Sequence, residues 1–102
     1  MLRETIKGAL TTAMKIKDTR GVSTLRLIMA ALKDRDIAAR GKGNSEGIDD
    51  AGILALLQSM VKQRRESIDM YQKGGRMELA QQEAEESSCI ESCMPKQLSA
   101  EQ

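Results

Sequence analysis

The sequence of 102 residues contains no histidine, no phenylalanine and no tryptophan, and only one proline and two cysteines. Without histidine, the commonest general base and the commonest metal ligand are both missing. Aromatic and β-branched residues, which favour strands, are scarce, whereas methionine and alanine, which favour helices, are frequent. Two cysteines are too few for a disulfide framework. These features predict a helical chain without a histidine-based catalytic or metal centre.

Long hydrophobic runs are also lacking. The longest uncharged segment, residues 51–61, has eleven residues, whereas a helix that crosses a bilayer needs roughly 20. The first residues lack the apolar core of a signal peptide, and the amphipathic segment there looks integral to the fold rather than like a transit peptide. We therefore expect a cytoplasmic location and no membrane partner.

The charges are divided unevenly between the two halves of the chain, although the formal net charge is only +1. Residues 1–45 contain ten Lys or Arg against four Asp or Glu, and residues 46–102 contain six against eleven. This asymmetry has two interpretations. The basic half could bind an anionic partner, or the two halves could pair with each other in the folded chain.

Apolar residues recur at steps of three and four in four segments, the periodicity of amphipathic helices. The pattern predicts helices over about 2–17, 19–40, 50–73 and 76–94. The glycine-rich segment 41–47 has no hydrophobic residue, and we expect it to be an exposed, flexible connection. Four amphipathic helices must cover one another, so the sequence predicts an all-α fold, a four-helix hairpin array or small bundle, in one domain over 1–102.

Several residues have the chemistry of helix ends. Asp49 suits the N-cap of the third helix, and the pair Gly74 and Gly75 suits its C-terminal end. Pro95 is expected to stop the fourth helix. Ser99 and Gln102 have the spacing of a capping box, which would begin a further helix.

The densest basic cluster consists of Lys62, Arg64 and Arg65. Together with five cations of the first half, it could follow a phosphate backbone; these are Arg26, Lys33, Arg35, Arg40 and Lys42. No aromatic residue is interleaved with these cations, so RNA binding would depend on shape and charge. In the alternative interpretation, the acidic segment 83–86 neutralises the cluster across a helical hairpin.

No set of residues forms a recognisable catalytic centre. The sequence has no glycine-rich phosphate loop and no nucleophile paired with a base, so we predict no catalytic residue, no cofactor and no metal. Cys89 and Cys93 lie four residues apart and so share a helix face. Two thiols are half of a zinc site, and we interpret them as small buried hydrophobic residues, with a redox or metal-sensing role as the alternative.

Four segments carry a resemblance to a known family. They read STLRLI at 23–28, KDRDIAARG at 33–41, KQRRESI at 62–68 and PKQLS at 95–99. In order and in register, they resemble the GatB/YqeY family. The resemblance implies a relation to the B subunit of the glutamine-dependent aspartyl/glutamyl-tRNA amidotransferase, a carbon-nitrogen ligase with glutamine as amido-N-donor. That subunit ends in this type of domain, and its helical tail helps to hold tRNA.

The resemblance covers the N-terminal helical part of the family, and the family's C-terminal tail subdomain is expected to be lacking. It implies a non-catalytic helical module that contacts tRNA or a protein partner. The alternative is a structural protein-interaction module that binds no RNA. Such a module would bind a partner or a second copy of the chain through the face of the helix at 76–94.

Overall fold

The computed structural model describes residues 2–44 and 46–94. Within these residues it contains four helices and no strand: α1 (Leu2–Lys15), α2 (Thr19–Gly41), α3 (Asp50–Lys73) and α4 (Met77–Ser92). The prediction of an all-α fold with four helices is confirmed. Two expectations, that Pro95 stops α4 and that a capping box follows at Ser99 and Gln102, lie outside the described residues.

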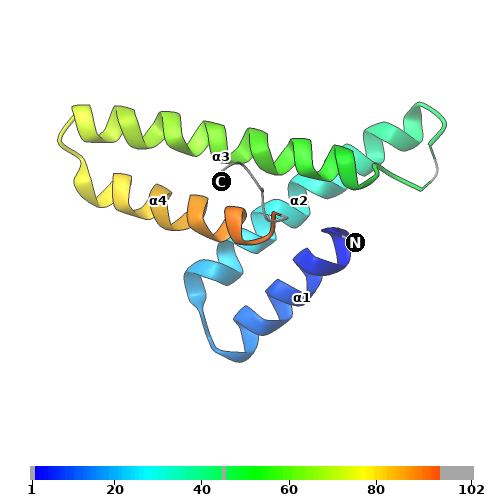
Figure 1. The fold of residues 1–102 in the computed structure, drawn as a ribbon, viewed down its shortest axis with the longest axis horizontal. Coiled ribbons are helices and arrows are strands. Elements are labelled where there is room, and N and C mark those ends of the chain that lie inside the picture. Colours follow the sequence, from blue (N-terminus) through cyan, green and yellow to red (C-terminus); the bar gives the residue numbers. More distant parts are fainter. Residues whose placement is uncertain (1, 45, 95–102) are drawn as a thin grey trace, which may run out of the picture.

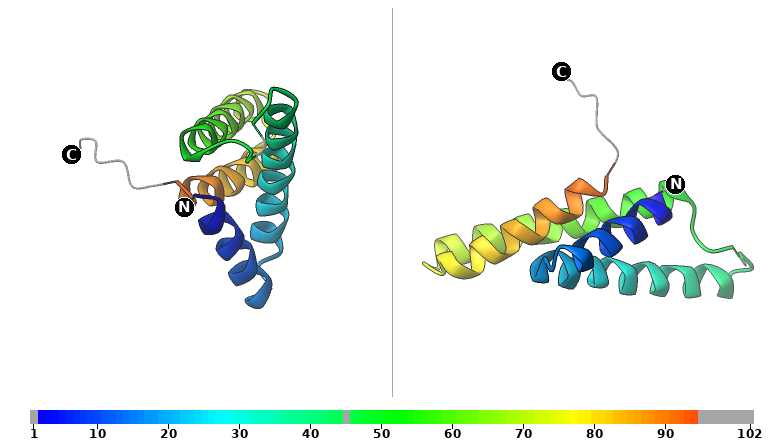
Figure 2. Two further views of the ribbon diagram at one scale, coloured as in Figure 1. Left: turned by 90° about the vertical axis from the view of Figure 1, so that its right-hand side faces the viewer. Right: turned by 90° about the horizontal axis from the view of Figure 1, so that it is seen from below.

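The helices form two pairs (Figure 1). α3 and α4 form an antiparallel hairpin, and α1 and α2 diverge as a V from the short turn that joins them (Figures 1 and 2). That turn lies at one end of the molecule, away from α3 (Figure 1). None of the described helices is both long enough and apolar enough to span a membrane.

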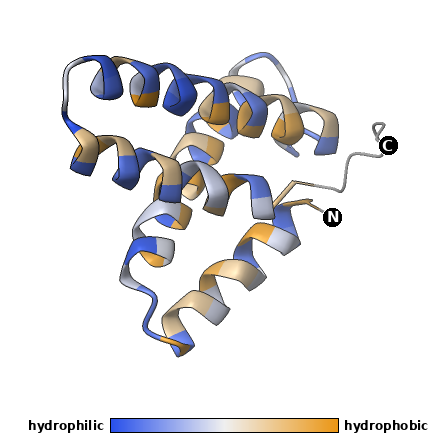
Figure 3. Ribbon diagram, turned by 60° about the vertical axis from the view of Figure 1, so that its left-hand side comes forward, coloured by the Kyte–Doolittle hydropathy of each residue, from blue (hydrophilic) through white to orange (hydrophobic). Residues whose placement is uncertain are grey.

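All four helices contribute to one hydrophobic core, because each is amphipathic (Figure 3). Its most deeply buried members include Ile6 of α1, Ile28 of α2, Leu57 of α3 and Ile90 of α4, each 0% exposed. The burial of Ile6 shows that the first helix is an integral part of the fold, as the sequence predicts.

The predicted ends of α3 are confirmed. The carboxylate of Asp49 accepts a hydrogen bond from the Gly52 backbone N–H at 2.9 Å, so Asp49 is the N-cap. Gly74 is the C-cap, and Gly75 follows with a left-handed φ of 75°. The N-cap of α2 is Asp18, whose side chain accepts from the Gly21 N–H at 3.0 Å.

α1 ends two residues earlier than predicted. The Asp18 N–H donates to the Ala13 carbonyl at 2.9 Å, and the Lys17 N–H donates to the Met14 carbonyl at 3.3 Å. These two bonds are those of a Schellman motif, which places Lys17 in the left-handed position at φ 59°. Glycine usually occupies that position, so the sequence carries no signal for this helix end.

The segment between α2 and α3 is exposed over only part of its length, although the sequence predicts exposure throughout. Most of it is exposed, but Gly47 is buried, so the prediction of an exposed segment over all of 41–47 is wrong at its end. Gly47 lies against the carboxylate of Asp36, and its φ is 86°. The Asn44 side-chain amide donates to the Gly47 carbonyl at 2.8 Å, which fixes this end of the segment.

A polar junction joins α1, α2 and the start of α3. Arg3 binds Asp36 through two hydrogen bonds, of 2.6 and 3.2 Å, and also donates to the Ile48 carbonyl at 2.8 Å. The Ile48 N–H donates to the Asp36 carboxylate at 3.0 Å. The hydrogen bond from Arg3 is the main cause that lowers the pKa of Asp36 below its usual value. Asp36 is therefore a structural residue that connects three helices.

Candidate nucleic-acid interface

Three of the predicted cations form one stripe on α2. Arg26, Lys33 and Arg40 are exposed and lie seven residues apart, which is close to two helical turns. Successive members are therefore on the same side of the helix, roughly 10 Å apart along its axis. None of them forms an ion pair with another residue in the described part of the chain.

Two members of this cationic stripe, Lys33 and Arg40, border an open groove between α1 and α2, whereas Arg26 lines a separate hollow nearer the α1–α2 turn. The groove has a volume of about 490 Å³, and Lys33 and Arg40 line it on the α2 side. Lys7 contributes a further exposed cation from α1. Apolar side chains of α2, including Met29 and Ile37, form part of its wall, and Arg3 and Asp36 also line it. The groove can therefore offer positive charge to a ligand from both helices.

Of the described residues that line this groove, Asp36 alone is acidic. Its carboxylate is already bound by Arg3, and the charge of Arg40 is a smaller contribution to its lowered pKa. Lys7, Lys33 and Arg40 thus keep their positive charge available, because the nearby carboxylate is neutralised by another residue.

Two of the predicted cations, Arg35 and Lys42, lie outside the stripe on α2. Arg35 follows Arg26 by nine residues, or two and a half turns, and so projects from the opposite side of α2. Lys42 is the C-cap residue that follows the helix. Both are exposed, but the fold does not bring them into the stripe.

The densest cluster of the sequence is on α3, and two of its three cations have carboxylate partners on α4. Arg64 donates to Glu86 at 3.2 Å, and Arg65 donates to Glu91 at 2.7 Å. Lys62 is exposed and has no ion-pair partner among residues 2–44 and 46–94. The predicted pairing across a helical hairpin is confirmed for Arg64 and Glu86, whereas Glu85 binds Arg20 of α2 at 3.0 Å.

Lys7 is not among the cations that the sequence predicts for the interface. The signal was present: Lys7 lies four residues after Arg3, so both are on the same face of α1. Nothing in the sequence, however, indicates which side of α2 this face meets.

The thiols of Cys89 and Cys93 lie in or against the hydrophobic core. Cys93 belongs to the core at 2% exposure, and Cys89 packs against it. Burial is the main cause that raises the pKa of each thiol above its usual value, so both stay protonated at neutral pH. Within the described residues, no group of three or more Cys, Asp or Glu side chains is placed to hold a metal ion. The burial of Cys93 and the packing of Cys89 against the core are consistent with the interpretation as small hydrophobic residues.

Comparison with known proteins identifies the family. The family model described as "Yqey-like protein" matches residues 3–102. The chain belongs to the YqeY-like family. The match includes the stripe on α2, the groove and the junction at Asp36.

The YqeY-like chain is similar to fungal proteins named "Altered inheritance of mitochondria protein 41, mitochondrial". It is 35% identical over 89 residues to the protein of Eremothecium gossypii, a match that covers 87% of this chain and 46% of the relative. It is 29% identical over 85 residues to that of Lachancea thermotolerans, with 83% and 43% covered. Its identity to the Saccharomyces cerevisiae protein is 28% over 89 residues, with 87% and 46% covered. The chain spans less than half the length of these relatives.

The names of these relatives correct the expected location. They are named as mitochondrial proteins, which contradicts the prediction of a cytoplasmic location. That prediction depended on the lack of a signal core and of a spanning segment, and neither property distinguishes the cytoplasm from the mitochondrion.

Proposed function

We propose that this YqeY-like chain is a non-catalytic helical module that contacts tRNA through the α1–α2 groove. Its relation to glutamine-dependent tRNA amidation rests on the resemblance to the amidotransferase B subunit. The observation that carries the proposal is the stripe of Arg26, Lys33 and Arg40, three exposed cations on one side of α2. Cations without internal partners are available to phosphates and release counterions when they bind.

The groove suits a ligand that is recognised by shape. The only aromatic residue of the chain, Tyr71, lies on α3 and does not line the groove. Without a ring on which a base can stack, single-stranded bases have no specific binding site here. Charged and apolar side chains along a groove suit the sugar-phosphate backbone of a folded RNA.

The test measures the affinity of the chain for tRNA at several salt concentrations. We expect the triple variant Arg26→Gln, Lys33→Gln and Arg40→Gln to bind more weakly and to show a shallower dependence on salt. Each lost phosphate contact should reduce the slope of log K against log salt by about 0.7 to 0.9. Circular dichroism should report an unchanged helical fold, because these side chains are exposed.

The matched control is the double variant Arg35→Gln and Lys42→Gln. It also removes exposed cations, from the same helix and its C-cap, but they lie outside the stripe. We expect a smaller loss of tRNA affinity than in a variant with two stripe residues changed. If the control and a variant with two changed stripe residues lost the same tRNA affinity, net charge and not the groove would determine binding. No binding of tRNA by the unmodified chain would refute the proposal.

The relatives' names support a mitochondrial location for this chain as well. Fractionation of cells that express a tagged full-length chain tests this second part of the proposal. Co-purification of the chain with mitochondria is expected.

The alternative function, a protein-interaction module that uses the face of α4, has less support. Ala80, Ser87 and Ile90 on that face are buried within the chain itself. The described helices α2 and α3 both pack against α4 (Figures 1 and 2). A partner would have to use another surface.

A further inference from the structure

The turn between α1 and α2 combines exposed hydrophobic side chains with cations. Ile16 is 68% exposed, and Met14 is about half exposed. They alternate in sequence with Lys15 and Lys17, which are also exposed. Hydrophobic side chains in contact with water are unfavourable unless a ligand covers them. This turn projects from the end of the V, where a flat surface could reach it (Figure 1).

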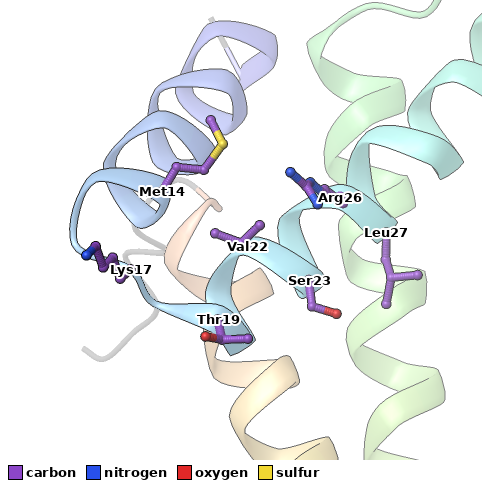
Figure 4. A pocket seen from close by; sticks show the side chains of 7 residues that line it. All are labelled: Met14, Lys17, Thr19, Val22, Ser23, Arg26 and Leu27. Carbon is purple, nitrogen blue, oxygen red and sulfur yellow. The ribbon is translucent and has the colours of Figure 1, made fainter.

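A hollow of about 600 Å³ opens beside the turn, with Met14 on the α1 side and Val22 and Arg26 on the α2 side (Figure 4). Lys17 lines it from the turn. Among the residues that the structure describes, the charged members of its lining are the cations Lys17 and Arg26, with no carboxylate. The hollow can therefore accept an anionic group next to apolar side chains.

The other charged residues near the turn are already engaged. Asp18 caps α2 by accepting from the Gly21 N–H. Arg20 pairs with Glu85 of α4 at 3.0 Å. Asp18 still carries one negative charge, so the sum for Lys15, Lys17, Arg26 and Asp18 remains positive.

The left-handed backbone conformation of Lys17 is a further feature of this turn. An L-residue in the left-handed conformation is strained, whereas glycine fits there without strain. A lysine at this position sacrifices stability and places an ammonium group at the edge of the hollow. Such strain is common where a side chain has a binding role.

We propose that the α1–α2 turn binds the surface of an anionic phospholipid bilayer. Lys17 and Arg26 contact a headgroup phosphate in the hollow, and Ile16 and Met14 enter the boundary between headgroups and acyl chains. Cations around exposed aliphatic residues are the combination that binds anionic membrane surfaces. This contact needs no spanning helix, so the lack of a long apolar segment does not oppose it.

The turn between α3 and α4 provides an internal comparison. It also has exposed hydrophobic residues, Met70 and Met77, and a cation, Arg76. There, however, Lys73 pairs with Asp69 at 3.0 Å, and Glu78 lines the adjacent hollow. Glu78 has no ion-pair partner among the described residues, so its carboxylate would repel anionic lipid. Charge complementarity therefore favours the α1–α2 turn over the α3–α4 turn as the contact with an anionic bilayer.

The test is co-sedimentation of the full chain with vesicles of phosphatidylcholine alone or of phosphatidylcholine mixed with phosphatidylglycerol. We expect binding to the mixed vesicles and not to phosphatidylcholine alone. Ile16→Ser should weaken the binding about tenfold, because one aliphatic side chain no longer enters the bilayer. Lys17→Gly removes a cation at a backbone position that suits glycine, and it should weaken the binding about fivefold.

Met77→Ser is the matched control, since Met77 is 59% exposed at the other turn. We expect this variant to bind the mixed vesicles as strongly as the unmodified chain does. Ile16→Ser should also leave tRNA affinity unchanged, which separates this proposal from the RNA interface. Equal binding of Ile16→Ser and the unmodified chain would mean that charge alone attracts the chain to vesicles, and the proposal would be wrong. It would also be wrong if Met77→Ser lost as much binding as Ile16→Ser, or if free inorganic phosphate displaced the chain completely. No binding of the unmodified chain to the mixed vesicles would also refute the proposal.

Discussion

Gly47 determines whether the junction of α1, α2 and α3 can close. A Cβ atom at this position would overlap the Asp36 carboxylate, and the φ of 86° disfavours any other residue. We predict that Gly47→Ala lowers the free energy of unfolding by about 2 kcal/mol, because Asp36 must move away from Arg3. Chemical denaturation monitored by circular dichroism measures the change.

Gly43 provides the control for this prediction. Its φ is also positive, at 95°, but a Cβ atom there would meet no atom within 4 Å. Gly43→Ala should therefore cost only the backbone strain, about 1 kcal/mol. If the two variants were equally destabilised, the close contact with Asp36 would have no energetic importance.

At Lys17 we predict a gain in stability, because there a substitution by glycine removes backbone strain. Lys17→Gly should raise the free energy of unfolding by up to about 0.5 kcal/mol, since relief of the left-handed strain exceeds the added flexibility of the unfolded chain. Lys15→Gly is the comparison, because Lys15 lies in the last turn of α1, where glycine destabilises a helix. A melting temperature of Lys17→Gly below that of the unmodified chain would contradict the prediction.

At the scale of helices, the α3–α4 hairpin contains two ion pairs in different surroundings. The side chains of Arg64 and Glu86 are each 14% exposed, whereas those of Arg65 and Glu91 are 68% and 45% exposed. Water and salt screen an exposed pair more effectively, so the first pair should have the larger interaction energy.

Double-mutant cycles can compare the two pairs directly. With Arg→Met and Glu→Gln substitutions, we predict a coupling of about 1 kcal/mol for Arg64 and Glu86, and of about 0.5 kcal/mol or less for Arg65 and Glu91. Addition of salt should leave the first coupling largely intact. A larger coupling for the exposed pair would contradict this account.

Helix positions were predictable because apolar periodicity and capping residues are local signals. The bounds of α3 agree with the prediction, as Asp49 and Gly74 mark its ends. The end of α1 was missed because the Schellman motif uses lysine in place of glycine. The buried end of the α2–α3 segment was missed because Gly47 is covered by Asp36, which is distant in sequence.

The candidate site was predictable only in part, because its geometry depends on how the helices pack. Spacing alone places Arg26, Lys33 and Arg40 on one face of α2. It could not show that α1 forms the other wall of the groove with Lys7. Nor could it show that Asp36, on the same helix, is neutralised by Arg3.

For the whole molecule, the junction predicts a loss of stability in acid. The pKa of Asp36 is lower in the folded chain than its ordinary value of 3.8, chiefly because Arg3 donates a hydrogen bond to it. A carboxylate with a lowered folded pKa contributes its full stability above the unfolded pKa. We predict that this contribution falls as the pH decreases below 3.8 toward the lower folded pKa.

Asp36→Asn removes the titrating group and should flatten this part of the pH dependence. Denaturation at a series of pH values from neutral to acidic compares the two chains. Asp34→Asn is the control, since Asp34 is an exposed acidic residue of the same helix. An unchanged acid dependence in Asp36→Asn would contradict the assigned role of the junction.

The polar junction also has a consequence for the order of folding. It closes chain segments that are 33 and 45 residues apart, from Arg3 to Asp36 and to Ile48. The ion pairs of the α3–α4 hairpin join residues only 22 and 26 apart. Because closure of a longer loop costs more entropy, the hairpin should form before the junction in the folding transition state. Substitutions at Asp36 would then accelerate unfolding and leave the folding rate nearly unchanged.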